Sequence, residues 1–162
     1  MGEGIRNQAH HWYQENWDPD RTVGDWFELM GRSGWGYPGW PLEWLGRGLN
    51  RLDARAVREE RRRLGALAPP SGIAPTLLAP MLFEHGTHDQ MQRFLPGMAW
   101  GGETMCQMLS EPDAGSDLAL VTTRAERDGD EWVVTGSKIW TSRAEEVDYG
   151  MLLARTDPDV SK

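Results

Sequence analysis

Cysteine is almost absent from this sequence, and long apolar runs are absent altogether. Cys106 is the one cysteine among 162 residues, which excludes an internal disulfide and the small secreted scaffolds that depend on disulfides. No apolar run reaches the roughly 18 residues that span a membrane. The start, "MGEGIRNQAHHWYQ", also lacks the apolar core of a signal peptide. We therefore expect a soluble, cytoplasmic protein with no membrane insertion.

Positive charge is scarce in comparison with negative charge. The sequence has 17 lysine and arginine residues against 25 aspartate and glutamate residues, a formal net charge of -8. This balance argues against nucleic acid and against an anionic membrane surface as partners. The four histidines, at positions 10, 11, 85 and 88, have no matching cysteine or carboxylate spacing, so the sequence predicts no metal site.

The hydrophobic pattern changes once along the chain. Before about residue 100 the apolar residues recur at helical spacing, whereas after Thr104 short β-rich runs are separated by Gly, Asp and Ser. The sequence therefore predicts an α+β protein. Its all-α N-terminal region would cover 1–102, and a partial antiparallel β-domain would cover 103–162.

Five helices are expected in the first region. They run from Ile5 to Trp17, from Thr22 to about Arg32, from Asn50 onward, from Gly72 to a stop at Gly86, and from Thr87 onward. Thr22 and Asn50 are N-cap residues, and Thr87 forms a capping box with Gln90. The third helix would carry Val57, Leu64 and Leu67 inward. The fourth is apolar nearly all round, which predicts a buried helix.

The second region is expected to form strands. "TMCQML" is one strand, and "ALVTTRAER" and "EWVVTG" flank Asp128 and Gly129, a dipeptide typical of a tight hairpin. "SKIWTS" and "DYGMLLART" would be further strands. If so, Trp140 lies in or beside a strand, and period-two alternation points Trp140 and Ser142 to the same face.

The stretch "SEPDAGSD", from Ser110 to Asp117, follows the first of these strands. A strand that delivers Ser110 to a sharp turn at Pro112 presents hydroxyls and free backbone amides together, which suits a phosphate or the polar edge of a ligand. Ser, Pro, Asp and Gly also gather wherever a chain turns. The turn by itself leaves both interpretations open.

Two long motifs of the chain together resemble the acyl-CoA dehydrogenase family. The match runs through "CQMLSEPDAGSDLALVTTRAERDGDEWVVTGSKIWTSRAEEVDYGMLLARTDPD" and extends upstream through "GYPGWP" and "FEHGTHDQMQRFLPGMAWGGE". The resemblance implies a helical N-terminal domain, a middle β-domain that this sequence contains in part, and a C-terminal helical bundle beyond Lys162. It also implies an oxidoreductase of fatty acid or lipid metabolism that uses FAD to desaturate the Cα–Cβ bond of an acyl-CoA thioester.

Seven residues match positions that bind the flavin in that family. They are Gln107, Leu109, Ser110 and Ser116 on one segment, and Trp140, Thr141 and Ser142 on another. The resemblance places Leu109 and Ser110 near the pyrimidine edge of the flavin, and Ser116 would also reach the acyl-CoA substrate. Ser142 would contact flavin N5, and Trp140 would pack against the ring system.

The resemblance assigns no catalytic residue to this chain. In the family the base that takes the α-proton is a glutamate of the C-terminal bundle, so Glu111, Asp113 and Asp117 are expected to anchor backbone amides instead. The complete form would pass electrons to an electron-transfer flavoprotein and would be a homo- or hetero-oligomer. The isolated chain would be inactive.

Two other functions remain open at this point. The chain could be a non-catalytic, truncated or split subunit that contributes half a flavin site or an interface to a partner. It could also belong to a related flavoprotein oxidase on the same scaffold, with oxygen as the electron acceptor.

Overall fold

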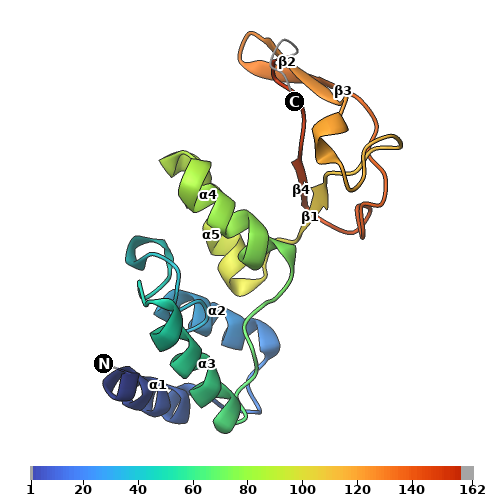
Figure 1. The fold of residues 1–162 in the computed structure, drawn as a ribbon. Helices are drawn as coiled ribbons and strands as arrows, with labels where there is room; N and C mark the ends of the chain where they lie inside the picture. The colour runs from blue at the N-terminus through green and yellow to red at the C-terminus, as the bar shows by residue number, and fades with distance from the viewer. Residues whose placement is uncertain (1, 158–162) are drawn as a thin grey trace. The chain divides into compact units, whose positions relative to one another are not determined.

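The computed structural model describes residues 2–157, which form an α+β fold with two compact units (Figure 1). Unit 1 is Met1–Glu103 and unit 2 is Thr104–Lys162. The helices of unit 1 are α1 (Gly2–Asn16), α2 (Val23–Ser33), α3 (Arg51–Arg63), α4 (Ala79–His85) and α5 (His88–Trp100). None of the helices in residues 2–157 has the length and apolar character that a membrane crossing requires.

Side-chain caps fix where three of these helices begin. The Thr22 hydroxyl accepts a hydrogen bond from the Asp25 amide at the start of α2, and the Asn50 side chain accepts from two amides at the start of α3. Thr87 and Gln90 form a reciprocal capping box at the start of α5. The three predicted caps are therefore confirmed, because each satisfies amides that have no partner inside the helix.

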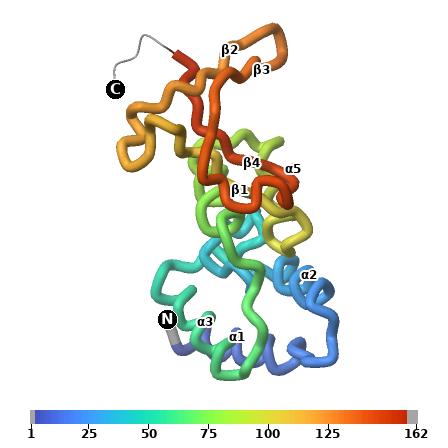
Figure 2. Tube along the Cα trace, turned by 90° about the vertical axis from the view of Figure 1, so that its right-hand side faces the viewer, coloured from blue at the N-terminus to red at the C-terminus, as the bar shows by residue number. Residues whose placement is uncertain are grey.

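In unit 1, α1 packs against α3 (Figure 2), and the hydrophobic core also includes side chains from α2. Its largest fully buried side chains include Tyr13, Trp26, Met30 and Val57. The Tyr13 hydroxyl donates to the Trp35 carbonyl oxygen at 3.1 Å, so the buried phenol is satisfied. Val57 faces inward as predicted. Tyr13 from α1 and Trp26 from α2 are thus the two largest fully buried side chains.

Two burial expectations for unit 1 are wrong. Leu67 is 40% exposed, because α3 ends at Arg63 and the helical spacing no longer applies beyond it. The predicted fourth helix is a π-helical turn, Ala74–Leu78, followed by α4, and its side chains Leu77 and Met81 are exposed. The described residues of unit 1 cover only one face of this segment. Its end at Gly86 is confirmed, although with extended rather than left-handed backbone.

The described residues of unit 2 form two pairs of strands. β2 (Arg124–Asp128) and β3 (Glu131–Thr135) form the predicted antiparallel hairpin, with Gly129 at a positive φ of 60° in the turn. β1 (Met105–Met108) pairs with β4 (Tyr149–Leu152) in parallel, Met105 opposite Tyr149. The expectation of antiparallel pairing therefore holds for the hairpin and is wrong for β1 and β4. These two strands meet through a long connection, which allows a parallel arrangement.

The segment from Gly136 to Thr141 is not a strand, so the prediction for "SKIWTS" is wrong. Trp140 has a φ of 57°, in the left-handed region where strand pairing cannot continue. Period-two alternation therefore does not relate the directions of Trp140 and Ser142. The backbone of this segment is held by contacts from elsewhere in unit 2, described next.

Candidate functional site

The structure brings the two predicted site segments together in unit 2. The Ile139 amide donates a hydrogen bond of 2.9 Å to the carbonyl oxygen of Ser110, so the residue before Trp140 adjoins the start of the Ser110–Asp117 turn. The turn itself is closed by two reciprocal backbone hydrogen bonds between Glu111 and Ala114. Residues separated by nearly 30 positions thus share one location.

The buried side chain of Glu111 holds the two segments together. It is 4% exposed, and one carboxylate oxygen accepts from the Thr122 amide and hydroxyl, both at 2.7 Å. The other oxygen accepts from the Thr123 amide at 2.8 Å and from Lys138 Nζ at 2.9 Å. The structural role expected for Glu111 is confirmed: the carboxylate satisfies two backbone amides and one buried ammonium.

The electrostatics of this group follow from its surroundings. Burial raises the pKa of the Glu111 carboxyl, but hydrogen bonds from Thr123, Thr122 and Lys138 favour the ionised form and together hold the pKa well below its usual range. Glu111 is therefore a charged structural group at neutral pH. Such a carboxyl is poorly suited to accept a proton from a substrate.

The other carboxylates of the turn are exposed. Asp117 accepts a hydrogen bond from the Ala119 amide at 3.2 Å and caps the short helical turn Leu118–Leu120, as expected for a structural residue. Asp113 is exposed.

The predicted flavin-facing side chains vary in exposure. Gln107 points outward from β1, Ser116 and Ser142 are exposed, and Leu109 and Ser110 are half-buried. Among the described residues no hydrogen bond joins Ser116 or Ser142 to the opposite segment. The structure thus places the backbones of the segments together through Ser110 and Ile139, and leaves these hydroxyls open to solvent.

Two features of the second segment fit a ligand-binding role. The Thr141 hydroxyl is buried without a hydrogen-bond partner among the described residues, and a buried polar atom of this kind needs a partner. Trp140 is 87% exposed while its backbone has the unfavourable φ of 57°. A bulky residue in this conformation stores strain that is most often found at functional sites. The Thr141 hydroxyl and the apolar surface of Trp140 together fit a planar cofactor with polar edges.

Lys138 is a buried residue of the candidate site that sequence reasoning missed. Its Nζ donates to the Leu109 carbonyl oxygen and to Glu111, both at 2.9 Å, and its side chain is 5% exposed. One feature of the sequence could have drawn attention to Lys138. It is one of only two lysines in the sequence, and it directly precedes Ile139 and Trp140.

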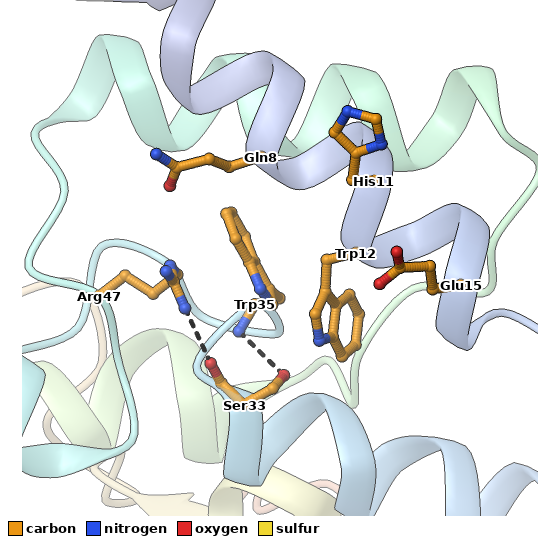
Figure 3. Close-up of a pocket in the computed structure, with 7 residues that line it drawn as sticks. All are labelled: Gln8, His11, Trp12, Glu15, Ser33, Trp35 and Arg47. Carbon is orange, nitrogen blue, oxygen red and sulfur yellow. Dashed lines mark hydrogen bonds between the residues drawn. The ribbon is translucent and has the colours of Figure 1, made fainter.

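Unit 1 has a separate hollow with a volume of about 490 Å³. Figure 3 shows its lining, from α1, the end of α2 and the following loop: Gln8, His11, Trp12, Glu15, Ser33, Trp35 and Arg47. The Arg47 guanidinium lies 3.8 Å from the centre of the Trp35 ring and donates to the Ser33 carbonyl oxygen at 3.1 Å. Burial lowers the pKa of Arg47. The sequence did not predict this hollow.

Comparison with known proteins identifies the family. The N-terminal domain model of acyl-CoA dehydrogenases matches residues 1–102, and the middle domain model matches residues 106–162. The chain belongs to the acyl-CoA dehydrogenase family. No cluster of three or more metal-ligating side chains occurs in the part of the chain that the structure describes.

The similar proteins include both curated relatives and solved structures. Acyl-CoA dehydrogenase IpdE1 of Mycobacterium tuberculosis is 43% identical over 132 residues, which are 82% of this chain and 34% of that protein. The steroid ACAD Tcur3481-Tcur3483 matches with a TM-score of 0.66 and 34% identity over 98% of this chain and 44% of that one. The ChsE4-ChsE5 complex of Mycobacterium tuberculosis matches with a TM-score of 0.67 and 34% identity, over 97% of this chain and 43% of that one. The chain thus spans about a third of the IpdE1 length.

Proposed function

We propose that this chain supplies part of the FAD site of an acyl-CoA dehydrogenase. The observation that carries the proposal is the buried, unpartnered hydroxyl of Thr141, next to the exposed indole of Trp140. Both lie on a segment that the Ile139 amide ties to Ser110. Family membership supports FAD as the ligand, because this family desaturates acyl-CoA thioesters with a flavin.

FAD, when bound, accepts the hydride that leaves the β-carbon as the Cα–Cβ bond of the thioester becomes a double bond. The Ser142 hydroxyl would donate a hydrogen bond at flavin N5, where charge develops. The Trp140 indole would exclude water from one face of the ring system. On the first segment, Ser110 and the backbone at Leu109 would bind the pyrimidine edge.

Two further residues complete the proposed contacts. Gln107 is exposed at the third position of β1, and its side-chain amide would contact the flavin beyond Leu109. Ser116 is exposed beyond the turn, and its hydroxyl would contact both the flavin and the acyl-CoA substrate. Both groups can donate a hydrogen bond without first breaking one, because no side-chain hydrogen bond occupies them among the described residues.

The complete enzyme would contain more than these residues. As the resemblance to the family implies, we place the base that takes the α-proton on a glutamate of the C-terminal bundle, outside this chain, whereas Glu111 binds two amides and an ammonium. We also propose that the N-terminal helical domain covers 1–102 and that the incomplete middle β-domain covers 103–162.

An electron-transfer flavoprotein would accept the electrons, and the complete form would be a homo- or hetero-oligomer. The ChsE4-ChsE5 neighbour is a complex, which favours the hetero-oligomer.

The direct test is equilibrium dialysis of the purified chain against FAD. We expect saturable binding that Thr141→Ala weakens, because the variant removes the orphaned hydroxyl without enlarging the side chain. Thr76→Ala in unit 1 is a matched control, since it removes a threonine hydroxyl from outside the proposed site. Equal FAD affinity of wild type and Thr141→Ala would contradict the proposal.

A second experiment, with the complete enzyme, distinguishes a dehydrogenase from an oxidase. Faster reoxidation of the reduced flavin by oxygen than by an electron-transfer flavoprotein would indicate an oxidase.

A further inference from the structure

Glu111 and Lys138 form a buried ion pair that joins the two site segments. Their side chains are 4% and 5% exposed, and Nζ lies 2.9 Å from the carboxylate. The other ion pairs recorded for the described residues of unit 2, Arg124–Glu126 and Arg143–Glu146, are exposed at both ends. The buried pair therefore differs in kind from its neighbours and needs its own explanation.

The pair joins three stretches of chain. Glu111 binds the amides of Thr122 and Thr123, which precede β2. Lys138 binds the carbonyl oxygen of Leu109 as well as Glu111, so its ammonium is fixed on both sides of Ser110. The next residue, Ile139, completes the connection through its amide. The position of Trp140 relative to Ser110 is thus set by the hydrogen bonds of the two residues before it, Lys138 and Ile139.

The energetics favour a role in geometry over a role in stability. Removing two charges from water costs about as much as their attraction returns, and apolar replacements of such pairs are often as stable. Trp140, meanwhile, has a left-handed backbone and an indole that is 87% exposed. An indole this exposed gains little from packing that could offset the strain, so the anchored residues just before Trp140 maintain its conformation.

We propose that Lys138 and Glu111 are positioning residues that hold Trp140 and Thr141 in their ligand-facing conformation. The identity of the ligand rests on the proposed flavin function, whereas the anchoring rests on the contacts of unit 2 alone. The pair acts through the backbone, because neither charged group reaches the exposed side of the segment. A site supported in this way is formed before its ligand arrives, which reduces the ordering cost of binding.

The test compares Lys138→Met and Glu111→Gln with Arg143→Met as the matched control. The control removes a cation of the same region whose ion pair with Glu146 is exposed. In both test variants we expect the dissociation constant for FAD to rise at least about tenfold and the Ile139 amide to exchange hydrogen at least about tenfold faster. The control should stay within about twofold in both measurements.

FAD affinity and Ile139 exchange within about twofold of the control in both variants would overturn the proposal. A second measurement does not require that the variants fold. The Ile139 amide donates to Ser110 and the Thr123 amide donates to Glu111. In the unmodified chain, native-state exchange should show these two amides opening with equal free energies, because the Glu111–Lys138 pair joins the segments that contain them. Independent opening would overturn the proposal. If the chain binds no FAD but these amides behave as expected, the flavin assignment fails and the anchoring role stands.

Discussion

Replacing Glu60 by Gln should destabilise unit 1 more than any other single change of charge on α3. Glu60 is 2% exposed, and Oε1 accepts from Arg63 Nε at 3.0 Å and from Arg63 Nη2 at 2.5 Å. The same oxygen lies 2.7 Å from His10 Nδ1 on α1. The carboxylate therefore joins α1 to α3 at the edge of the core.

The expected loss is about 1.5–3 kcal/mol, the usual worth of hydrogen bonds to a charged group. For a unit of this size such a loss lowers the melting temperature by roughly 6–24 °C. Circular dichroism at 222 nm during heating measures it, since unit 1 holds the long helices. Glu59→Gln is the matched control, because Glu59 is the adjacent residue and its ion pairs with Arg6 and Arg55 are exposed.

The same carboxyl predicts a pH dependence. Hydrogen bonds from Arg63 lower the pKa of Glu60; burial raises it less, and His10 lowers it further. Since the folded-state pKa lies below the usual 4.5, the stabilisation is fully present above that pH and is lost as pH falls through the folded-state pKa. The Glu60→Gln variant should lose less stability than wild type on acidification below pH 4.5. A melting temperature that falls no further than in Glu59→Gln, or parallel acid profiles, would refute this reasoning.

Three further predictions concern the core, a loop and activity. Met30→Ala, at a fully buried position, should cost about 2–5 kcal/mol in urea unfolding, whereas exposed Leu52→Ala should change little. Gly46→Ala should disorder the loop after α2, because its Cβ would overlap the Trp40 carbonyl oxygen; faster proteolysis of the loop than in wild type checks it. The 162-residue chain alone should not desaturate acyl-CoA with FAD and an artificial acceptor, since absence of a positioned base costs about 10²–10⁴ in rate. Turnover within tenfold of an intact family member would indicate a base within this chain.

The helix starts could be predicted because their causes are local. Thr22, Asn50 and Thr87 each bind amides within three residues, so short sequence windows contain the relevant information. Burial of the segment before Gly86 could not be predicted in this way. Leu77 and Met81 are buried only if another part of the fold packs against them. An apolar sequence pattern shows which side chains can be buried, but not whether a packing partner is present.

The site was predictable as two segments but not as a geometry. The aromatic and β-branched residues around Trp140 favour a strand, yet tertiary anchors at Lys138 and Ile139 fix a left-handed backbone there. The parallel pairing of β1 with β4 is likewise non-local. The carboxylate of Glu111 was expected to bind amides, but its buried ammonium partner depends on the folding of the whole unit.

The measurement that tests the flavin assignment most directly is a map of backbone amide chemical shifts during titration of the chain with FAD. NMR detects weak binding as well as tight binding, so it suits a site that is completed by residues outside this chain. We expect the largest shifts at 107–116 and 140–142, and none around the hollow that contains Trp35 and Arg47. Shifts confined to that hollow, or no shifts in unit 2 at saturating FAD, would contradict the assignment.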